Sequence, residues 1–312
     1  MDDSEHSIVR QNTEMEKRRS QLAKRGLDLI STLDSRSSPL IISVHSSRNS
    51  VGKSMVSTNL GTIMATQGLR VGILDANFEW HSLQYLFNLN ETEIGHSLND
   101  YLWGKCEIQD MVQDVTDKVG ADIQGKIFLI PASMNPGEIA RVLRDGYDIG
   151  LLTDVCRSLI KSLNLDVLLI ETRASLSQDS LHLIAISNVL VEIMRPDEQD
   201  YRGTAGVMDV VRKLNIPRIL LVINQVWSHA DLDGIRNRVE QSYNCKVAAM
   251  LPFSEEMSGS GIFSLQFPDH EITLGLKKLT DQIANLSIPS LSRDGDSVQG
   301  VAALNNHRMP LV

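Results

Sequence analysis

The stretch LIISVHSSRNSVGKSMVS, residues 40 to 57, joins a short apolar run to a polar loop that ends in Gly52-Lys53-Ser54. The apolar run suits a buried strand, and the residues from Lys53 onward have the spacing of a helix. A loop between two such elements presents backbone N–H groups and a helix N-terminus to an anion. Lys53 would then reach the β- and γ-phosphates of a nucleotide, and the Ser54 hydroxyl would bind Mg²⁺. The expected phosphate-contact residues are Ser47, Asn49, Ser50, Val51, Gly52, Lys53, Ser54 and Met55.

Apolar runs and helical segments alternate along the rest of the chain. The strand-like runs are 40–45, 70–76, 126–132, 166–172, 188–194, 218–224 and 246–252. Helical spacing is found at 53–67, 138–163, 203–214, 231–243 and 271–286. Continuous apolar strands separated by helices are typical of parallel sheets that are covered on both faces. We expect an α/β fold with a doubly wound, mostly parallel sheet of seven or eight strands, helices on both faces, and ligands at the carboxyl ends of the strands.

Composition and charge exclude several classes of protein. The 312 residues are 42% hydrophobic and 22% charged, and their formal net charge is −9. This acidic total argues against wholesale binding to nucleic acid or to an anionic membrane, although a local basic patch can hide within it. The three cysteines are far apart and form no C-x-x-C pair, which favours reduced thiols in a cytoplasmic protein. No signal peptide is evident, and no run approaches the ~18 apolar residues of a membrane span.

We expect three segments: an N-terminal extension at 1–36, a main domain at 37–287 and a flexible tail at 288–312. Within the extension, residues 13–33 have the pattern of an amphipathic helix with a basic cluster at 17–25. That cluster is either a solvated face of a helix packed on the main domain or a contact for DNA or an acidic protein. The tail has few basic residues and sparse apolar ones, which argues against membrane binding through an amphipathic C-terminal helix.

Two carboxylates stand at strand ends, where a metal site would need them. Asp75 lies at the end of the run 70–76, and Glu171 lies at the end of the run 166–172. Parallel strands bring their carboxyl ends to one edge of the sheet, so both acids can face the phosphate loop. Acidic residues also cap strand ends in solvent, but beside a phosphate loop an Mg²⁺ role is favoured. The expected metal ligands are Ser54, Asp75 and Glu171.

The segments HSSRNSVGKS, GLRVGILDAN, LDVLLIETRAS and VAAMLPFSEEM resemble the MinD/ParA family of deviant Walker A ATPases, and most closely its MinD-like branch. The resemblance covers roughly residues 38–286. It implies a P-loop NTPase fold of the SIMIBI type, with ATP or ADP and Mg²⁺ as cofactors. It also implies an ATP-dependent homodimer that sandwiches two nucleotides, and a protein partner or cargo adaptor in intracellular positioning or partitioning. By the same resemblance, Asn224 and Pro252 would flank the adenine.

Three departures from the family pattern bear on hydrolysis. The family's signature lysine, which reaches across the dimer, is Arg48 here, and it is either an arginine-finger equivalent or a solvated side chain. The water-positioning acid of the family's D-x-D motif is Asn77, which cannot take a proton. The Walker B acid is Glu171 rather than aspartate. The residues expected to govern turnover are Arg48, Lys53 and Asn77.

Binding and turnover are therefore expected to separate. Binding depends on backbone N–H groups, Lys53 and Mg²⁺, whereas hydrolysis also needs a positioned acid or base, which typically contributes ~10²–10⁴ in rate. Ser47 and Ser50 each cost about 1–2 kcal/mol where the loop requires a left-handed backbone. We expect ATP binding to survive better than hydrolysis. Three classes stay open: a slow or partner-stimulated positioning ATPase, a pseudo-ATPase adaptor working through protein contacts, and a nonspecific DNA-binding partition protein.

Overall fold

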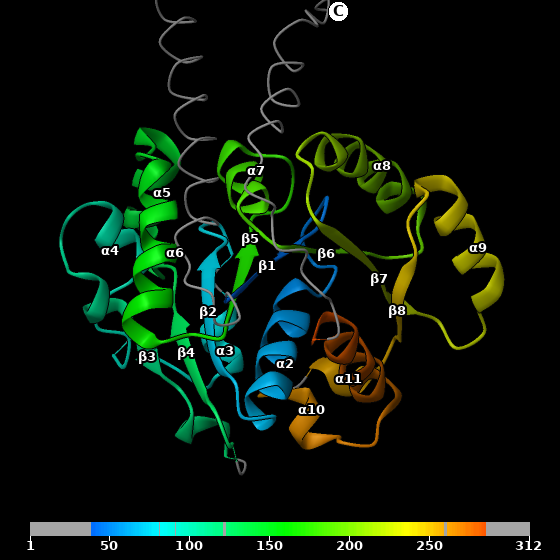
Figure 1. The fold of residues 1–312 in the computed structure, drawn as a ribbon, viewed down its shortest axis with the longest axis horizontal. Helices are drawn as coiled ribbons and strands as arrows, with labels where there is room; N and C mark the ends of the chain where they lie inside the picture. Colours follow the sequence, from blue (N-terminus) through cyan, green and yellow to red (C-terminus); the bar gives the residue numbers. More distant parts are fainter. Residues whose placement is uncertain (1–38, 81, 91, 121–122, 259–260, 285–312) are drawn as a thin grey trace, which may run out of the picture.

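The structure is a computed structural model that describes residues 39–80, 82–90, 92–120, 123–258 and 261–284. Within these residues, one eight-stranded sheet has the order β3-β4-β2-β5-β1-β6-β7-β8 (Figure 1). Neighbouring strands are parallel except β3 and β4, so the expected doubly wound, mostly parallel sheet is confirmed. The strands are β1 (Leu40–His45), β2 (Arg70–Ala76), β3 (Gln113–Asp114), β4 (Lys126–Ile130), β5 (Val167–Thr172), β6 (Val189–Met194), β7 (Arg218–Val226) and β8 (Val247–Pro252).

The seven predicted strands are confirmed, and β1 and β2 begin and end where the runs 40–45 and 70–76 do. Nearly all of their residues are buried, which explains why these runs are continuously apolar rather than alternating. The additional strand, β3, has two residues and pairs antiparallel with β4 at the edge of the sheet. A strand this short leaves no periodic signal in the sequence.

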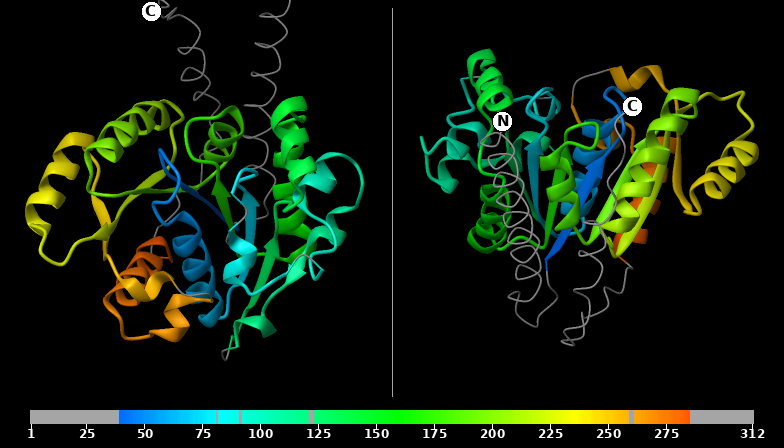
Figure 2. Two further views of the ribbon diagram at one scale, coloured as in Figure 1. Left: turned by 180° about the vertical axis from the view of Figure 1, so that it is seen from behind. Right: turned by 90° about the horizontal axis from the view of Figure 1, so that it is seen from above.

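Helices cover both faces of the sheet (Figures 1 and 2), and apolar clusters fill the space between. One face carries α2 (Lys53–Thr66), α3 (Leu83–Leu86), α10 (Phe263–Gln266) and α11 (Glu271–Ala284). The other face carries α4 (Leu98–Leu102), α5 (Pro136–Asp145), α6 (Gly150–Leu163), α7 (Gln178–Ala185), α8 (Glu198–Lys213) and α9 (Leu232–Tyr243). Three short 3₁₀ turns are η1 (Ile108–Met111), η2 (Asp117–Val119) and η3 (Glu255–Ser258).

The prediction of a single helix over 138–163 is wrong, because this stretch belongs to two helices, α5 and α6. α5 ends at Asp145, and Gly146 follows it with a φ of +68°. Glycine has no Cβ and adopts a positive φ at little cost, so it ends the helix here. α7 was not predicted, since its eight residues give only about two turns of periodicity.

The carboxyl ends of β1, β2, β5 and β6 meet near the centre of the sheet. β1 lies between β5 and β6 in the sheet. The connection from β1 to β2 crosses one face of the sheet through α2, and the connection from β5 to β6 crosses the other face through α7. In open α/β sheets, ligands bind in the crevice outside such a point. The register of β2 on β5 places Asp75 beside Glu171 at this edge.

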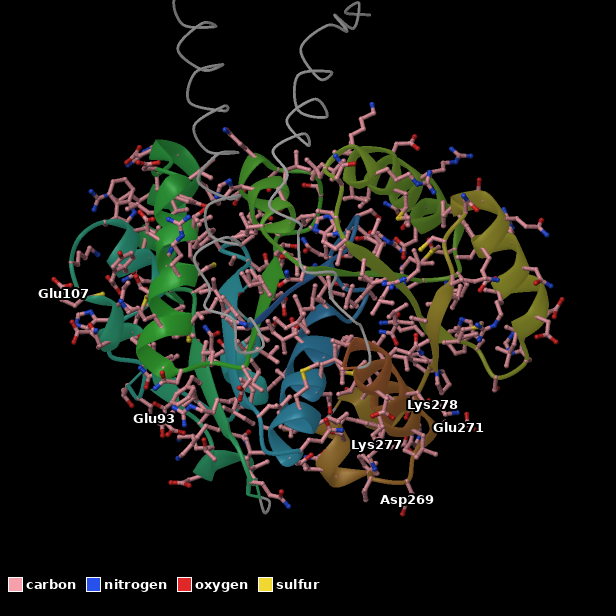
Figure 3. The ribbon with its side chains drawn as sticks, viewed as in Figure 1. Glu93, Glu107, Asp269, Glu271, Lys277 and Lys278 are labelled. Atoms are coloured by element: carbon pink, nitrogen blue, oxygen red, sulfur yellow. The ribbon has the colours of Figure 1, made fainter. Side chains whose placement is uncertain are left out.

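The surface of α11 shows how an amphipathic helix covers the sheet. Ile272 and Leu276 are fully buried against the core, while the charged residues of the same helix face outward. Figure 3 shows such charged side chains on the periphery of the molecule: Glu93, Glu107, Asp269, Glu271, Lys277 and Lys278.

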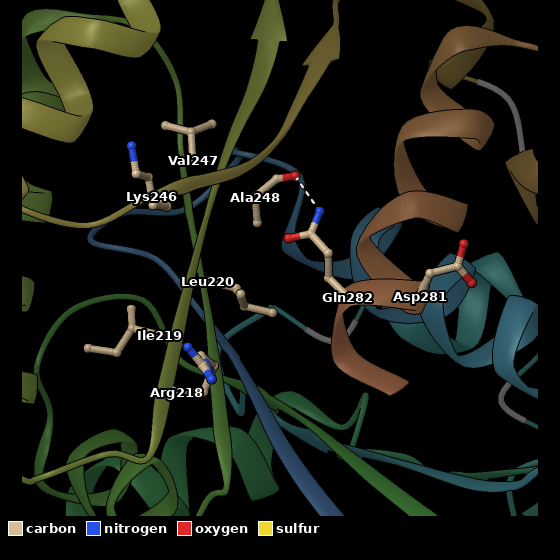
Figure 4. A pocket seen from close by; sticks show the side chains of 8 residues that line it. All are labelled: Arg218, Ile219, Leu220, Lys246, Val247, Ala248, Asp281 and Gln282. Carbon is tan, nitrogen blue, oxygen red and sulfur yellow. Dashed lines mark hydrogen bonds between the residues drawn. The ribbon is translucent and has the colours of Figure 1, made fainter. Parts of the chain in front are cut away.

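A hollow of about 530 Å³ lies at the amino ends of β7 and β8, beside α11 (Figure 4). Gln282 of α11 forms part of its wall and donates from Nε2 to the carbonyl oxygen of Ala248 at 3.0 Å. Arg218, the first residue of β7, also lines it. Because the hollow lies at the edge opposite the β1–α2 loop, it is separate from the expected ligand site.

The predicted extension at 1–36 and tail at 288–312 lie outside the described residues, so the basic helix, its DNA contact and the tail stay predictions. The described residues all fall within the predicted main domain, 37–287. None of the helices in the described ranges is both long and apolar enough to cross a membrane.

Two helical glycines provide a test of the packing. A Cβ at Gly61 of α2 would lie 2.6 Å from Cδ1 of Ile73, whereas a Cβ at Gly206 of α8 would meet nothing within 4 Å. We expect Gly61→Val to lower the free energy of unfolding by about 1–3 kcal/mol through overpacking. Gly206→Ala should raise it by about 0.5–1 kcal/mol, because alanine restricts the unfolded chain. Urea denaturation measures both changes, and a stabilising Gly61→Val would contradict the packing described for α2.

Candidate functional site

The loop between β1 and α2 has two residues with a left-handed backbone, Ser50 with a φ of +62° and Gly52 with a φ of +99°. Ser47 and Asn49 have no positive φ, so the expected steric cost of about 1–2 kcal/mol falls on Ser50 alone. Packing also requires glycine at position 52, since a Cβ there would lie 2.2 Å from Nδ2 of Asn224.

The carboxyl end of β7 supports this loop. Asn224 is fully buried, and its Nδ2 donates to the carbonyl oxygen of Val51 at 2.8 Å. Gln225 donates from Nε2 to the carbonyl oxygen of Ser50 at 3.4 Å. Asn224 was predicted to flank an adenine, but in this arrangement it holds the loop, and contact with a base would require its side chain to move. Pro252 ends β8 and is half-buried.

The other predicted contacts surround the start of α2. Ser47 packs against α8, where a Cβ on Gly203 would lie 2.4 Å from the Ser47 hydroxyl. Met55 is half-buried against the core cluster on the α2 face of the sheet. The predicted loop residues are thus together at the end of β1 and the first turn of α2.

Lys53 begins α2 and is only 5% exposed. Its Nζ donates to the Ser46 hydroxyl at 3.1 Å. Burial lowers the pKa of Lys53, while four nearby carboxylates act in the opposite direction: those of Glu171, Glu192, Asp75 and Glu79. Several acids around one ammonium would give the site an excess of negative charge when they ionise. Such a site favours a phosphate that arrives with a divalent cation over a bare one.

Asp75 and Glu171 are fully buried side by side, so neither is a solvated strand-end acid. The Ser54 hydroxyl donates to Oε1 of Glu171 at 2.7 Å. Burial, reinforced by the neighbouring Glu171, raises the pKa of Asp75 well above its usual value. Burial also raises the pKa of Glu171, against the opposing effects of Lys53 and Ser54. Oδ2 of Asp75 and Oε2 of Glu171 have no hydrogen-bond partner among the described residues, and this donor set of two carboxylates and a hydroxyl fits Mg²⁺.

Asn77 lies next to these acids and supports them. Its backbone N–H donates to Oδ1 of Asp75 at 3.0 Å, and its side chain is close enough to Glu171 to stabilise the charged form of that acid. The side chain is 3% exposed and has no group that accepts a proton in the way a carboxylate does. Asn77 thus occupies the position of the family's water-positioning acid, but here it donates to Asp75 and stabilises the charged form of Glu171.

Arg48 is neither solvated nor free to reach another subunit in this structure. Its Nε contacts Asp200, its Nη2 contacts Asp197, and its Nη1 donates to Oε1 of Gln199 at 2.8 Å. Asp200 is fully buried, and the Arg48 side chain is 23% exposed. Arg48 is therefore placed neither as an arginine finger nor as a solvated side chain. It belongs to an intramolecular ion-pair cluster that connects the loop to the start of α8.

Three charged residues of this site were missed in the sequence: Glu79, Arg173 and Glu192. Glu192 of β6 is fully buried, and both of its carboxylate oxygens lack a hydrogen-bond partner among the described residues. An acid within the otherwise apolar run 188–194 was a signal that could have identified it. Arg173 forms ion pairs with Glu79 and Asp179, which lie 94 and 6 residues away in sequence. No spacing rule predicts the first of these contacts.

Comparisons with known proteins agree with this geometry. A ParA family model described as a NUBPL iron-transfer P-loop NTPase matches residues 38–112. An uncharacterised ATP-binding protein of Methanocaldococcus jannaschii is 20% identical over 242 residues, which cover 74% of this chain and 82% of that protein. The septum site-determining protein MinD from Pyrococcus horikoshii, complexed with Mg-ADP, has a TM-score of 0.66 and 16% identity, covering 81% of this chain and 99% of that one. This chain has a P-loop fold of the MinD/ParA type.

The MinD/ParA-type fold also relates this chain to the MinC:MinD cell division complex of Aquifex aeolicus. The TM-score is 0.66 at 16% identity, and the match covers 80% of this chain and 97% of that one. At this level of identity the likeness concerns the fold. The role of each residue in this chain therefore has to be argued from its own contacts.

The buried carboxylate pair makes a pH-dependent prediction. An acid whose folded pKa is raised binds more protons in the folded state than in the unfolded state, so the free energy of unfolding falls as pH rises from about 4 toward the folded pKa. Asp75→Asn removes this loss. We expect the variant to be more stable than wild type near pH 7 and the difference to shrink as pH falls toward 4, as measured by urea denaturation across that range.

Glu192→Gln is the matched control for this prediction. Burial raises the pKa of Glu192 well above its usual value, so this variant should also gain stability near neutral pH. Glu192 is not an expected metal ligand, so the expected Mg²⁺ dependence of nucleotide binding should persist in Glu192→Gln and be lost in Asp75→Asn. Loss of Mg²⁺ dependence in both variants would argue against a specific metal role for Asp75.

Proposed function

We propose that this protein binds ATP and ADP with Mg²⁺ and acts as a nucleotide-dependent dimeric switch in intracellular positioning or partitioning, with weak or partner-stimulated ATP hydrolysis. The observation that carries the proposal is the group formed by Lys53, Ser54, Asp75 and Glu171 behind a phosphate loop. One oxygen of each carboxylate, Oδ2 of Asp75 and Oε2 of Glu171, lacks a hydrogen-bond partner among the described residues. The Lys53 ammonium is close enough to both acids to lower their pKa values.

The charges at the site support a metal-bound nucleotide as the ligand. Bound Mg²⁺ would be held by Ser54, Asp75 and Glu171 and would supply positive charge to the phosphates. Lys53 would contact the phosphates directly, as the P-loop lysine does. The loop N–H groups and the N-terminus of α2 complete the anion site.

Slow turnover is supported by two residues. Arg48 is engaged by Asp197 and Asp200 of its own chain, so it supplies no charge to a partner subunit in this arrangement. An arginine finger is worth ~10³–10⁵ in rate where it acts. Asn77 cannot accept a proton from an attacking water. Partner binding that breaks the Arg48 ion pairs would provide the stimulation.

The comparisons support a partner and a role in positioning, and we place this role in the cytoplasm as part of the proposal. One similar structure is a complex of MinD with MinC, and another is a plasmid partition protein of Borrelia burgdorferi. We therefore propose a homodimer with ATP and a protein partner or cargo adaptor. DNA contact through residues 17–25 belongs to the same proposal, and membrane binding does not.

A second candidate function is a pseudo-ATPase adaptor that works through protein contacts. The Arg48 ion-pair cluster favours it, because two acids hold this arginine away from catalysis. Oδ2 of Asp75 and Oε2 of Glu171, which lack a hydrogen-bond partner among the described residues, favour the switch, because an adaptor without a ligand gains nothing from burying them.

Calorimetry with ATP and ADP tests the proposal, with Lys53→Ala as the binding-deficient control. We expect wild type to bind both nucleotides with a Kd of about 1 μM or below in Mg²⁺, and EDTA to weaken the binding strongly. Phosphate release by the protein alone should stay close to background. Light scattering should show a dimer with Mg-ATP and a monomer with Mg-ADP.

Absence of binding to either nucleotide would refute the proposed site. Rapid phosphate release by the isolated protein would refute the slow-turnover part while leaving the binding part intact. Binding with no change of size between Mg-ATP and Mg-ADP would favour the adaptor over the switch.

A further inference from the structure

Arg173 joins two connections that border the phosphate loop. It lies two residues beyond Glu171, just past the end of β5. Its Nη2 donates to Oε1 of Glu79 in the β2–α3 connection at 2.5 Å, and its Nη1 donates to Oδ2 of Asp179 in α7 at 3.4 Å. Its Nε is buried and has no partner among the described residues. A guanidinium with a spare donor is therefore held between two acids, with 22% of the side chain exposed.

The connection that carries Arg173 rests directly on the phosphate loop. The backbone N–H of Ser175 donates to the carbonyl oxygen of Ser46 at 3.2 Å, and the Ser46 hydroxyl accepts a hydrogen bond from Lys53. Glu79 is close enough to Lys53 for its charge to oppose the effect of burial on the pKa of that lysine. Arg173 and Lys53 thus act on the same carboxylate, Glu79.

Arg48, the arginine of the phosphate loop itself, is held more firmly than Arg173. Arg48 has two carboxylates and the Gln199 amide as partners, and one of the carboxylates, Asp200, is fully buried. Arg173 has one close carboxylate, and its second lies at 3.4 Å. Of these two arginines, Arg173 loses less when its guanidinium turns to a new anion.

We propose that Arg173 recognises the terminal phosphate of a bound nucleoside triphosphate and exchanges Glu79 for it. The inference rests on the nucleotide binding proposed above. A guanidinium presents a planar fork of donors that matches phosphate oxygens, and phosphate carries more negative charge than one carboxylate. A nucleoside diphosphate has no third phosphate, so Arg173 stays with Glu79 when ADP is bound.

The exchange gives the chain a way to distinguish the two nucleotides without Arg48. With ADP, Arg173 keeps the β2–α3 connection tied to α7 through Glu79 and Asp179. With ATP, Glu79 loses its partner and that tie is released. The number of phosphates is thereby communicated, within a single subunit, to two neighbouring connections that lead to helices on opposite faces of the sheet.

The affinities of the full-length protein for Mg·AMP-PNP, a non-hydrolysable ATP analogue, and for Mg·ADP test this proposal by calorimetry. We expect Arg173→Ala to weaken binding of the analogue about 10- to 100-fold, because the variant loses a charge-assisted hydrogen bond. Its affinity for ADP should stay within about threefold of wild type. Arg202→Ala is the matched control, because Arg202 is 81% exposed on α8 and pairs with Glu198 on the same helix. It should change neither affinity.

Glu79→Gln supplies a second, independent readout. Removal of the competing carboxylate should raise the affinity for the analogue more than the affinity for ADP. This gain should disappear in the double variant with Arg173→Ala, because the two residues act through one interaction and their effects are not additive.

Equal losses of analogue and ADP affinity in Arg173→Ala would indicate a structural role and overturn the proposal. An unchanged ratio of the two affinities in Glu79→Gln would overturn it as well, even if Arg173→Ala fails to fold. Wild-type protein that binds neither ligand would refute the proposed nucleotide binding, and this inference with it. Wild-type binding of both ligands leaves the proposed function intact whatever the variants do.

Discussion

The Lys53 ammonium, set among buried carboxylates, is the interaction on which the rest of this structure depends. The parallel register of β2 on β5 places Asp75 and Glu171 side by side, both fully buried, and Glu192 approaches from β6. Burying charge costs free energy unless it is paired, and one ammonium does not neutralise these acids. The residues of the site therefore leave part of its buried acid groups without a cationic partner. Such a site suits a ligand that brings a cation.

The loop around Lys53 is held from two directions by side chains distant in sequence. Asn224 fixes Val51 from the end of β7, and the Asp197–Asp200 pair fixes Arg48 from the start of α8. A loop with serine at the left-handed position 50 needs such support, because it lacks the conformational ease of glycine there. The geometry of this loop, with serine at position 50, therefore depends on these tertiary contacts.

Local patterns predicted the elements well and the side-chain partners poorly. The seven longer strands and the start of α2 followed from apolar runs and from the Gly52-Lys53-Ser54 signal. The break at Gly146 was missed because helical spacing continues on both sides of it. The partners of Arg48 lie about 150 residues away in the chain, so they depend on where the fold brings α8. The same holds for Arg173 and Glu79, whose contact exists only once β2 and β5 pair.

The exposed side chain of Trp80 gives this site a natural optical reporter. Trp80 directly follows Glu79 in the β2–α3 connection and is 62% exposed. Its backbone N–H donates to the carbonyl oxygen of Asn77 at 3.2 Å, so the backbone that carries the indole is joined to the residue beside Asp75 and Glu171. Indole emission responds to local polarity and to nearby charge. Rearrangement of this connection would therefore appear in the intrinsic fluorescence of the unlabelled protein, in real time.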